Sequence, residues 1–258
     1  MERPRRFGWP GCPHAVACLL LALLLGPPLS GSARGETVDA VSRQIADTLC
    51  VIRECPPCIV RIEINPKDAQ AVSGTGILLK DGRILTTAHL LRTATDQQRP
   101  HVWFGGRGGR PAVDGADGRS VTWKCSTSVD LAVLTGVAVP PWAGGASLAA
   151  APPKKGDLLT AVGVEPNGAV RVYAGTLLEL QGDSSLLALG LTTQKGDSGG
   201  PVFNLAGAVV GIVSGGGKFT RTTTSTETVA GGVVETTEKR EVPASFAVDL
   251  SKVDWKGF

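Results

Sequence analysis

The stretch TTQKGDSGGPVFN at residues 192–204 places three glycines and an aspartate around one serine, Ser198. An ordinary tight turn needs only one glycine, so the remaining glycines require another explanation. In acyl transfer, negative charge develops on the former carbonyl oxygen, and backbone N–H groups aimed at that point stabilise it. The amides of Gly196 and Ser198, two residues apart in a tight loop, can face one such point. The stretch therefore predicts a nucleophilic Ser198 beside an oxyanion hole made by Gly196 and Ser198.

A nucleophilic serine needs a base to accept its proton and a partner that holds the base in the correct tautomer. Two histidines lie beyond the apolar N-terminal region, His89 and His101. His89 follows a short apolar and threonine run, whereas His101 begins a strand-like run with no small residues around it. Asp130 stands directly before an apolar run, where a partly buried carboxylate requires a donor. We predict a triad of His89, Asp130 and Ser198, with His101 outside it.

Short runs with a period of two, separated by turn residues, fill the chain from Cys58 onward. This pattern, with 34 Gly and 17 Pro in the chain, predicts an all-β fold, either a barrel or a sandwich. Lys80-Asp81-Gly82 is a tight-hairpin signal between two of the runs. The expected strands are 58–64, 75–79, 83–87, 101–104, 121–125, 131–135, 158–164, 170–180, 186–189, 201–204, 208–214 and 245–248.

Three further segments have their own patterns. An apolar stripe between Glu36 and Ile52 predicts a short amphipathic helix before the β region. Residues 138–156, rich in Pro, Ala and Gly, read as a connection between two β halves. Residues 215–243 are rich in threonine and alternating charge, which suits either a long exposed hairpin or a mobile loop.

The N-terminus carries the signature of a secretory signal peptide. Three arginines precede an apolar run over 15–25, and small residues follow it up to Ala33, the expected cleavage site. Eleven apolar residues span only about 16 Å as a helix, too short for a bilayer, so no stable membrane anchor is expected. The mature protein is expected to be secreted or periplasmic. A net charge of +3 argues against a nucleic-acid partner.

Four cysteines remain beyond the signal peptide: Cys50, Cys55, Cys58 and Cys125. In an oxidising compartment they are expected to form two disulfides, with three connectivities open. The pair in Cys55-Pro56-Pro57-Cys58 has no βαβ context and no histidine at zinc-finger spacing, so a redox or metal site is not favoured. We expect neither a metal nor a cofactor.

Taken together, Thr87-Ala88-His89, Asp130-Leu131-Ala132 and Gly196-Asp197-Ser198-Gly199-Gly200-Pro201 resemble the chymotrypsin-fold serine peptidases. The segments SGTGILLKDGRILTTAHLL and GDSGGPVFNLAGAVVGIVSGG, with ASFAVDL later, are most similar to the peptidase domain of HtrA-type enzymes, over about residues 58–250.

The resemblance implies two six-stranded antiparallel β-barrels with the triad in the cleft between them. The expected boundaries are a signal peptide at 1–33, a helix and cysteine-containing lead-in at 34–57, and a peptidase domain at 58–258. Within that domain we place the N-terminal barrel at about 58–138, a linker at about 139–156 and the C-terminal barrel at about 157–250.

Two departures from the family bear on activation and assembly. Animal trypsins pair a freed N-terminal Ile or Val with the aspartate before the nucleophile, but no such cleavage site is present here. The partner of Asp197 is therefore left open between local backbone groups and Lys195. No PDZ-like domain is expected after residue 250, and the oligomeric state is left open.

The resemblance also places substrate-binding residues. Thr192 lies at the base of the first side-chain pocket, and Ser214-Gly215-Gly216 resembles the segment that pairs with the substrate backbone. A neutral pocket base disfavours Lys and Arg, because a buried ammonium would lack a carboxylate. The expected function is an exported serine endopeptidase that cleaves protein or peptide substrates after small or medium apolar residues. The alternatives are a catalytically silent binding module and an esterase or self-processing enzyme.

Overall fold

The computed structural model of the chain describes residues 58–64, 72–92, 94, 99–104, 121–180, 185–229 and 232–258. All of them belong to one compact unit, Gln44–Phe258, which follows an N-terminal unit, Met1–Arg43. The signal peptide, the helix over 36–52, Cys50 and Cys55 lie outside the described residues and stay predictions. Of the other two cysteines, Cys58 is buried and Cys125 half-buried, and they are not bonded to each other.

Six strands of the first half form an antiparallel sheet in the order β4-β1-β2-β3-β6-β5. In β1, Val60, Ile62 and Ile64 are buried while Arg61 and Glu63 between them are partly exposed, as expected for a half-buried strand. The predicted turn at Asp81-Gly82 joins β2 to β3, with Gly82 at φ +86°. Among the described strands β4 and β5 remain at the edges of a curled sheet. The strands are β1 (Ile59–Ile64), β2 (Val72–Leu78), β3 (Ile84–Thr86), β4 (Pro100–Phe104), β5 (Thr122–Cys125) and β6 (Ala132–Thr135).

The second half closes into an antiparallel barrel in the order β10-β11-β12-β9-β8-β7. The all-β prediction is confirmed, and the two sheets correspond to the two barrels that the resemblance implied. The strands are β7 (Leu158–Val164), β8 (Val170–Leu180), β9 (Leu186–Leu189), β10 (Pro201–Phe203), β11 (Val209–Val229) and β12 (Gly232–Asp249). Two 3-10 helices, η2 (Leu250–Lys252) and η3 (Trp255–Gly257), follow.

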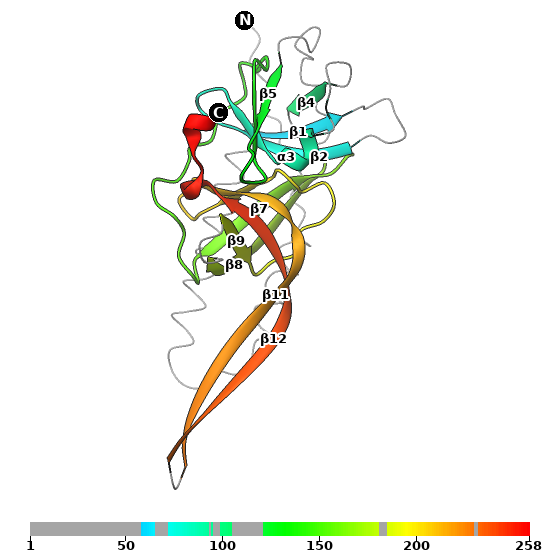
Figure 1. Ribbon diagram of the computed structural model, residues 1–258. Helices are drawn as coiled ribbons and strands as arrows, with labels where there is room; N and C mark the ends of the chain where they lie inside the picture. Colours follow the sequence, from blue (N-terminus) through cyan, green and yellow to red (C-terminus); the bar gives the residue numbers. More distant parts are fainter. Residues whose placement is uncertain are drawn as a thin grey trace, which may run out of the picture. The chain divides into compact units, whose positions relative to one another are not determined.

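A long hairpin, not a loop, occupies the threonine-rich segment 215–243. β11 and β12 pair antiparallel from Gly211↔Asp249 to Val229↔Gly232, with one register shift between Val213 and Gly215, and extend well beyond the rest of the barrel (Figure 1). Phe219 is buried where the hairpin leaves the barrel, packed with Ala188 and Ala244. We call the part beyond the barrel, Lys218–Val229 with Gly232–Pro243, the ribbon.

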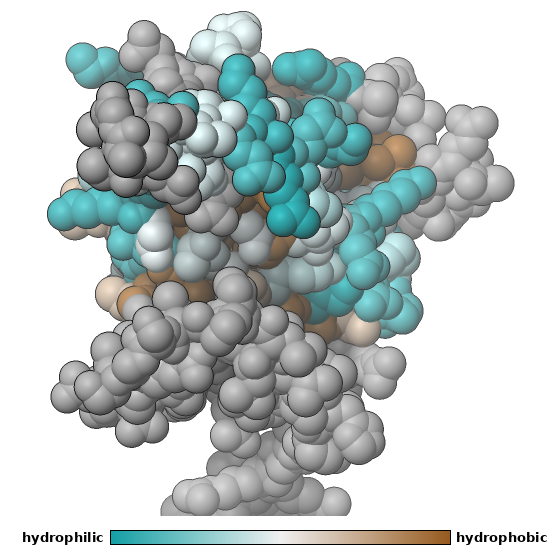
Figure 2. All heavy atoms as spheres, turned by 90° about the horizontal axis from the view of Figure 1, so that it is seen from below, coloured by the Kyte–Doolittle hydropathy of each residue, from teal (hydrophilic) through white to brown (hydrophobic). Residues whose placement is uncertain are grey.

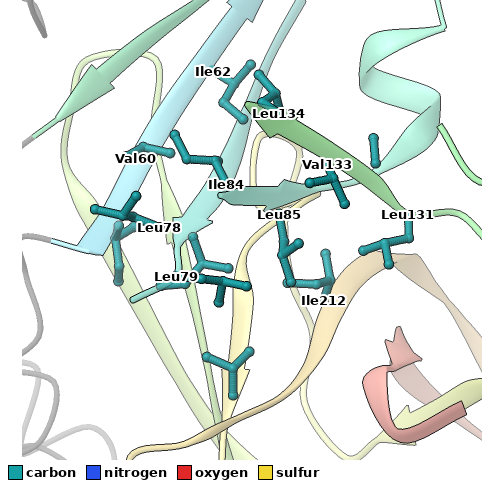
Figure 3. Packing of buried hydrophobic residues seen from close by; sticks show 14 of the residues in the cluster. Val60, Ile62, Leu78, Leu79, Ile84, Leu85, Leu131, Val133, Leu134 and Ile212 are labelled. Carbon is teal, nitrogen blue, oxygen red and sulfur yellow. The ribbon is translucent and has the colours of Figure 1, made fainter. Parts of the chain in front are cut away.

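One apolar core runs through both halves. Leu85 of β3 and Ile212 of β11 point toward one another, with Leu131 beside them (Figure 3). All three are fully buried. The connection between the halves is also tied to both, because Ala146 bridges to Leu79 and Leu148 bridges to Val209. Within the described part of the chain, no helix has both the length and the apolar character needed to cross a bilayer.

Candidate active site

His89 lies on the exposed side of a single helical turn, α3 (Ala88–Leu91), directly after β3. Thr87 precedes the turn in an extended conformation, with φ −85° and ψ 146°. The other three residues of α3 are buried in the first half of the domain, which directs the histidine away from the core. The imidazole keeps 46% of its surface exposed.

Asp130 holds this histidine by two hydrogen bonds. Its Oδ1 accepts from the His89 backbone N–H at 2.8 Å, and its Oδ2 lies 2.7 Å from His89 Nδ1. Ser214 Oγ, from β11 of the second half, donates to the same Oδ2 at 2.6 Å. Burial alone would raise the pKa of Asp130, but the hydrogen bonds from His89 and Ser214 outweigh it and lower the pKa to about 2. An ionised carboxylate only accepts, so Nδ1 carries the proton and Nε2 of a neutral His89 is a base.

Ser198 lies in the loop between β9 and β10, against β2. Its carbonyl oxygen accepts from the Thr75 N–H at 2.8 Å. A Cβ added at Gly74 would lie 3.0 Å from that oxygen and 2.6 Å from Leu90 Cδ2. Leu90 follows His89 in α3, so the same short piece of β2 contacts both the histidine segment and the serine segment.

Two of the glycines around Ser198 have a positive φ. Gly199 has φ +86°, and a Cβ there would clash with the Thr75 carbonyl and the Thr86 hydroxyl. Gly196 has φ +97°. The N–H groups of Asp197 and Gly199 donate to Gln194 O and Val213 O, whereas those of Gly196 and Ser198 donate to no other described residue. Two amides without an acceptor among the described residues therefore flank Asp197.

Thr75 supports this loop from the first half of the domain. The Thr75 hydroxyl is fully buried, donates to Gly196 O at 2.9 Å and accepts from the Val164 N–H at 2.9 Å. The Thr86 hydroxyl donates to Thr75 O at 2.7 Å. The sequence analysis missed both threonines, because hydroxyl residues are common in strands. The one usable signal was the position of Thr75 between two glycines, Gly74 and Gly76.

The buried Asp197 carboxylate is paired with Arg171 of β8. Arg171 Nη2 lies 2.8 Å from Asp197 Oδ1, and Nε donates to the same oxygen at 3.0 Å. Arg171 Nη2 also donates to Lys195 O at 2.9 Å, and the Gln194 N–H donates to Asp197 Oδ2 at 2.6 Å. The side chain of Asp197 is 1% exposed, so the ion pair is nearly water-free on that side. The sequence left this partner open, and neither Lys195 nor the local backbone alone provides it.

The comparison with protein families matches the trypsin-like peptidase domain over residues 74–212. That stretch is more than half of the chain and contains His89, Asp130 and Ser198. The chain belongs to this family. It is thus a trypsin-like hydrolase of the serine endopeptidase type. A comparison with curated proteins gives no match.

Solved structures share the fold of this trypsin-like peptidase at low sequence identity. The active form of the Rv3671c protease from M. tuberculosis is 21% identical, with TM-score 0.55, covering 79% of this chain and 80% of that one. An inactive form of the same protease is 21% identical, with TM-score 0.52 and coverages of 79% and 89%. A serine endoprotease from Yersinia pestis is 22% identical, with TM-score 0.55 and coverages of 78% and 61%. At such identities the likeness concerns the fold.

The residues expected to bind substrate surround β11 where it leaves Ser214. Thr192 is exposed, and the neighbouring Thr193 is bonded to Ser245 through both its N–H and its hydroxyl, at 2.8 and 2.9 Å. A Cβ added at Gly216 would lie 4.0 Å from Thr193 O, so these two segments of the trypsin-like domain face one another. The Ser214 side chain donates to Asp130, which ties β11 to the base of the site.

His101, which the sequence placed outside the triad, lies in β4 opposite Glu63 of β1. Strands β1 and β2 separate β4 from β3, the strand that leads into His89. Among the residues that the structure describes, no group of three or more His, Cys, Asp or Glu side chains is placed to hold a metal ion.

Proposed function

We propose that this chain is an exported serine endopeptidase in which Ser198 is the nucleophile, His89 the general base and Asp130 the residue that orients the base. The observation that carries the proposal is the Asp130 carboxylate, which binds both the backbone N–H and Nδ1 of His89 and so fixes the tautomer.

With these roles, the peptide bond is hydrolysed through an acyl-enzyme. His89 Nε2 takes the proton of Ser198 Oγ while the oxygen attacks the substrate carbonyl carbon, and the carbonyl electrons move to its oxygen. The N–H groups of Gly196 and Ser198 donate to that oxyanion. Re-forming the C=O bond breaks the C–N bond, and the leaving amine takes the proton from Nε2. Water then attacks the acyl-enzyme by the same route, releasing the acid and restoring Ser198.

Arg171 has a positioning role in this proposal. By binding the Asp197 carboxylate and the Lys195 carbonyl, it keeps the loop in the form that leaves the amides of Gly196 and Ser198 open. This internal ion pair takes the place that a freed N-terminus holds in animal trypsins.

The substrate preference rests on the neutral walls of the site. Thr192, Thr193, Gly216 and Ser245 provide hydroxyl and backbone groups but no carboxylate for a Lys or Arg side chain. We expect cleavage after small or medium apolar residues. A peptide library with equal amounts of each residue before the scissile bond tests this, and a preference for Arg would contradict it.

Labelling with a fluorophosphonate probe tests the nucleophile. The wild-type chain should be labelled, Ser198→Ala should not, and Ser147→Ala is the matched control because Ser147 is exposed and bonds through its backbone. Labelling that survives in Ser198→Ala would contradict the assignment. Export is tested separately by sequencing the N-terminus of the mature chain, which should begin after Ala33.

A further inference from the structure

Along the ribbon, no described strand pairs with the outer edge of β11. β11 pairs on this edge with β10, from Pro201↔Ile212 to Phe203↔Val209, and among the described strands with none beyond that point. Its other edge is covered by β12 up to Val229↔Gly232. An uncovered strand edge presents N–H and C=O groups to which another extended chain can pair.

This open edge begins at the active site. The register of β11 with β12 shifts between Val213 and Gly215, and Ser214 at the shift reaches Asp130. A Cβ added at Gly215 would meet no other group within 4 Å, and Gly216 and Gly217 are exposed, so there is open space beside the strand here. From Gly216 to Thr226 the edge runs on for roughly 34 Å.

The backbone groups that face outward can be assigned. The N–H and C=O of Val213 bond to Gly200 O and to the Gly199 N–H, so they point away from β12. Groups alternate along an antiparallel pair, and Val213 is opposite Ala247. In β12, the backbone N–H and C=O groups of Ser245, Pro243 and every second residue back to Thr237 therefore point away from β11. Pro243, which lacks an N–H, fits this position. Their partners, which face the open edge, are Gly216, Lys218, Thr220, Thr222 and Thr224.

The two edges of the ribbon differ in chemistry. Between Phe219 and Thr226, β11 carries six hydroxyl residues and one charged residue, Arg221. The facing part of β12, from Glu235 to Pro243, carries five charged residues and the proline, which are the devices that deter strand pairing. Exposed side chains on the side seen from below are mostly hydrophilic (Figure 2). One edge is thus protected and the other is not.

We propose that the open edge of β11 from Gly216 to Thr226 binds the part of an extended polypeptide substrate that precedes the scissile bond, as an added β-strand. This proposal rests on the function proposed above, because it takes the side chain before the scissile bond to lie between Thr193 and Gly216. Recognition is through the backbone, so it tolerates many sequences but depends on substrate length. The partner is an unfolded or extended chain.

Nested peptides test the length dependence. With the same cleavage sequence, a peptide with twelve residues before the scissile bond should have at least about a tenfold higher kcat/KM than one with four, mainly through a lower KM. Replacing residues 222–239 by Asn-Gly keeps the pair Arg221↔Arg240 and should abolish this advantage without changing turnover of the short peptide. Equal kcat/KM for both lengths in the wild type, or an advantage that survives the shortening, would overturn the proposal.

A matched pair of proline variants tests the edge itself. Thr222 and Lys239 face one another, and each directs its N–H away from the other strand. Thr222→Pro should lower kcat/KM for the long peptide by about fivefold, whereas Lys239→Pro should leave it unchanged. Equal effects of the two variants would count against the open edge.

Binding separates this proposal from the proposed function. Ser198→Ala should bind the fluorescently labelled long peptide more tightly than the short one, whether or not the wild type is a peptidase. A wild-type chain that fluorophosphonate does not label, but that binds the long peptide more tightly than the short one, would refute the proposed function and leave the docking edge standing. Ribbon-dependent dimers in sedimentation, with no length dependence of peptide binding, would assign the edge to a second copy of the chain and overturn the proposal.

Discussion

The carboxylate of Asp130 receives three hydrogen bonds, and two of them come from the residue proposed as the base. Each bond favours the ionised form, so Asp130 stays an acceptor for Nδ1 well below the ordinary carboxyl pKa of 3.8. Burial of the Asp130 carboxylate costs free energy, which the hydrogen bonds from His89 and Ser214 offset. The three side chains therefore depend on one another.

His89→Ala should lower kcat/KM by about 10³-fold or more while leaving the fold intact, because the base and the nucleophile act as a unit. Peptide hydrolysis measures the activity, and circular dichroism measures the fold. His101→Ala is the control, and full activity in His89→Ala would contradict the role of His89.

Asp130→Asn should lower stability as well as activity. The folded-state pKa of Asp130, about 2, is below the ordinary value of 3.8. Its contribution, at most about 2 kcal/mol, is therefore present above pH 4 and is lost as the pH falls toward 2. Urea unfolding of the wild type and of Asp130→Asn should differ most above pH 4 and converge below pH 3. A difference that grows with acidity would contradict this sign.

Arg171→Met should leave the buried Asp197 carboxylate unpaired and release the Lys195 carbonyl. We expect a loss of about 3 kcal/mol in unfolding free energy and at least about a tenfold lower kcat. Arg83→Met is a matched control, because Arg83 forms an exposed pair with Asp81 at 2.7 Å and should cost about 1 kcal/mol or less. Unfolding curves and steady-state kinetics of both variants provide the comparison. An unchanged kcat in Arg171→Met would remove its positioning role.

At the scale of elements, β2 is the strand on which the site depends most, since it contacts both α3 and the serine loop. Thr75→Val keeps the shape of the side chain but leaves Gly196 O and the Val164 N–H without their shared partner. We expect a loss of about 1–3 kcal/mol in unfolding free energy and a lower kcat. Thr135→Val, which removes an exposed hydroxyl paired with Thr122, should change neither, and thermal unfolding with kinetics distinguishes the two.

Most strands could be predicted from the sequence because their signals are local. The runs at 158–164, 170–180 and 186–189 have the observed bounds, and most of the others differ by one to three residues at their ends. The runs at 208–214 and 245–248 miss the parts of β11 and β12 that form the ribbon. The ribbon could not be separated from a mobile loop, since threonine-rich strands without a buried face carry no period of two in hydrophobicity. Its strands appear only once the register of β11 and β12 is known.

In the candidate site too, the residues with local signals could be predicted and the distant partners could not. His89, Asp130 and Ser198 each stand in a recognisable local motif, and the structure places Asp130 against His89. Arg171 lies 26 residues before Asp197, between two valines of β8, so no short motif connects the two. Contacts between distant segments, such as Thr75 with Gly196, need the fold before they can be found.

At the scale of the whole molecule, the internal ion pair between Arg171 and Asp197 predicts that the site does not need a free N-terminus. A chain with an acetylated or tagged N-terminus should therefore have the same kcat/KM as the processed chain. Parallel kinetics of the two preparations measure this. Activity that appears only after removal of the tag would show that Asp197 needs a second partner.

The site draws on both halves of the domain: Thr75 in the first holds the serine loop of the second, and Ser214 in the second holds Asp130 of the first. In a newly made chain with only one half folded, the proposed base His89 and the proposed nucleophile Ser198 are therefore not both held in place. We expect such a chain to be unable to cleave other copies that are still unfolded. Peptidase activity is expected only once both halves have folded against one another.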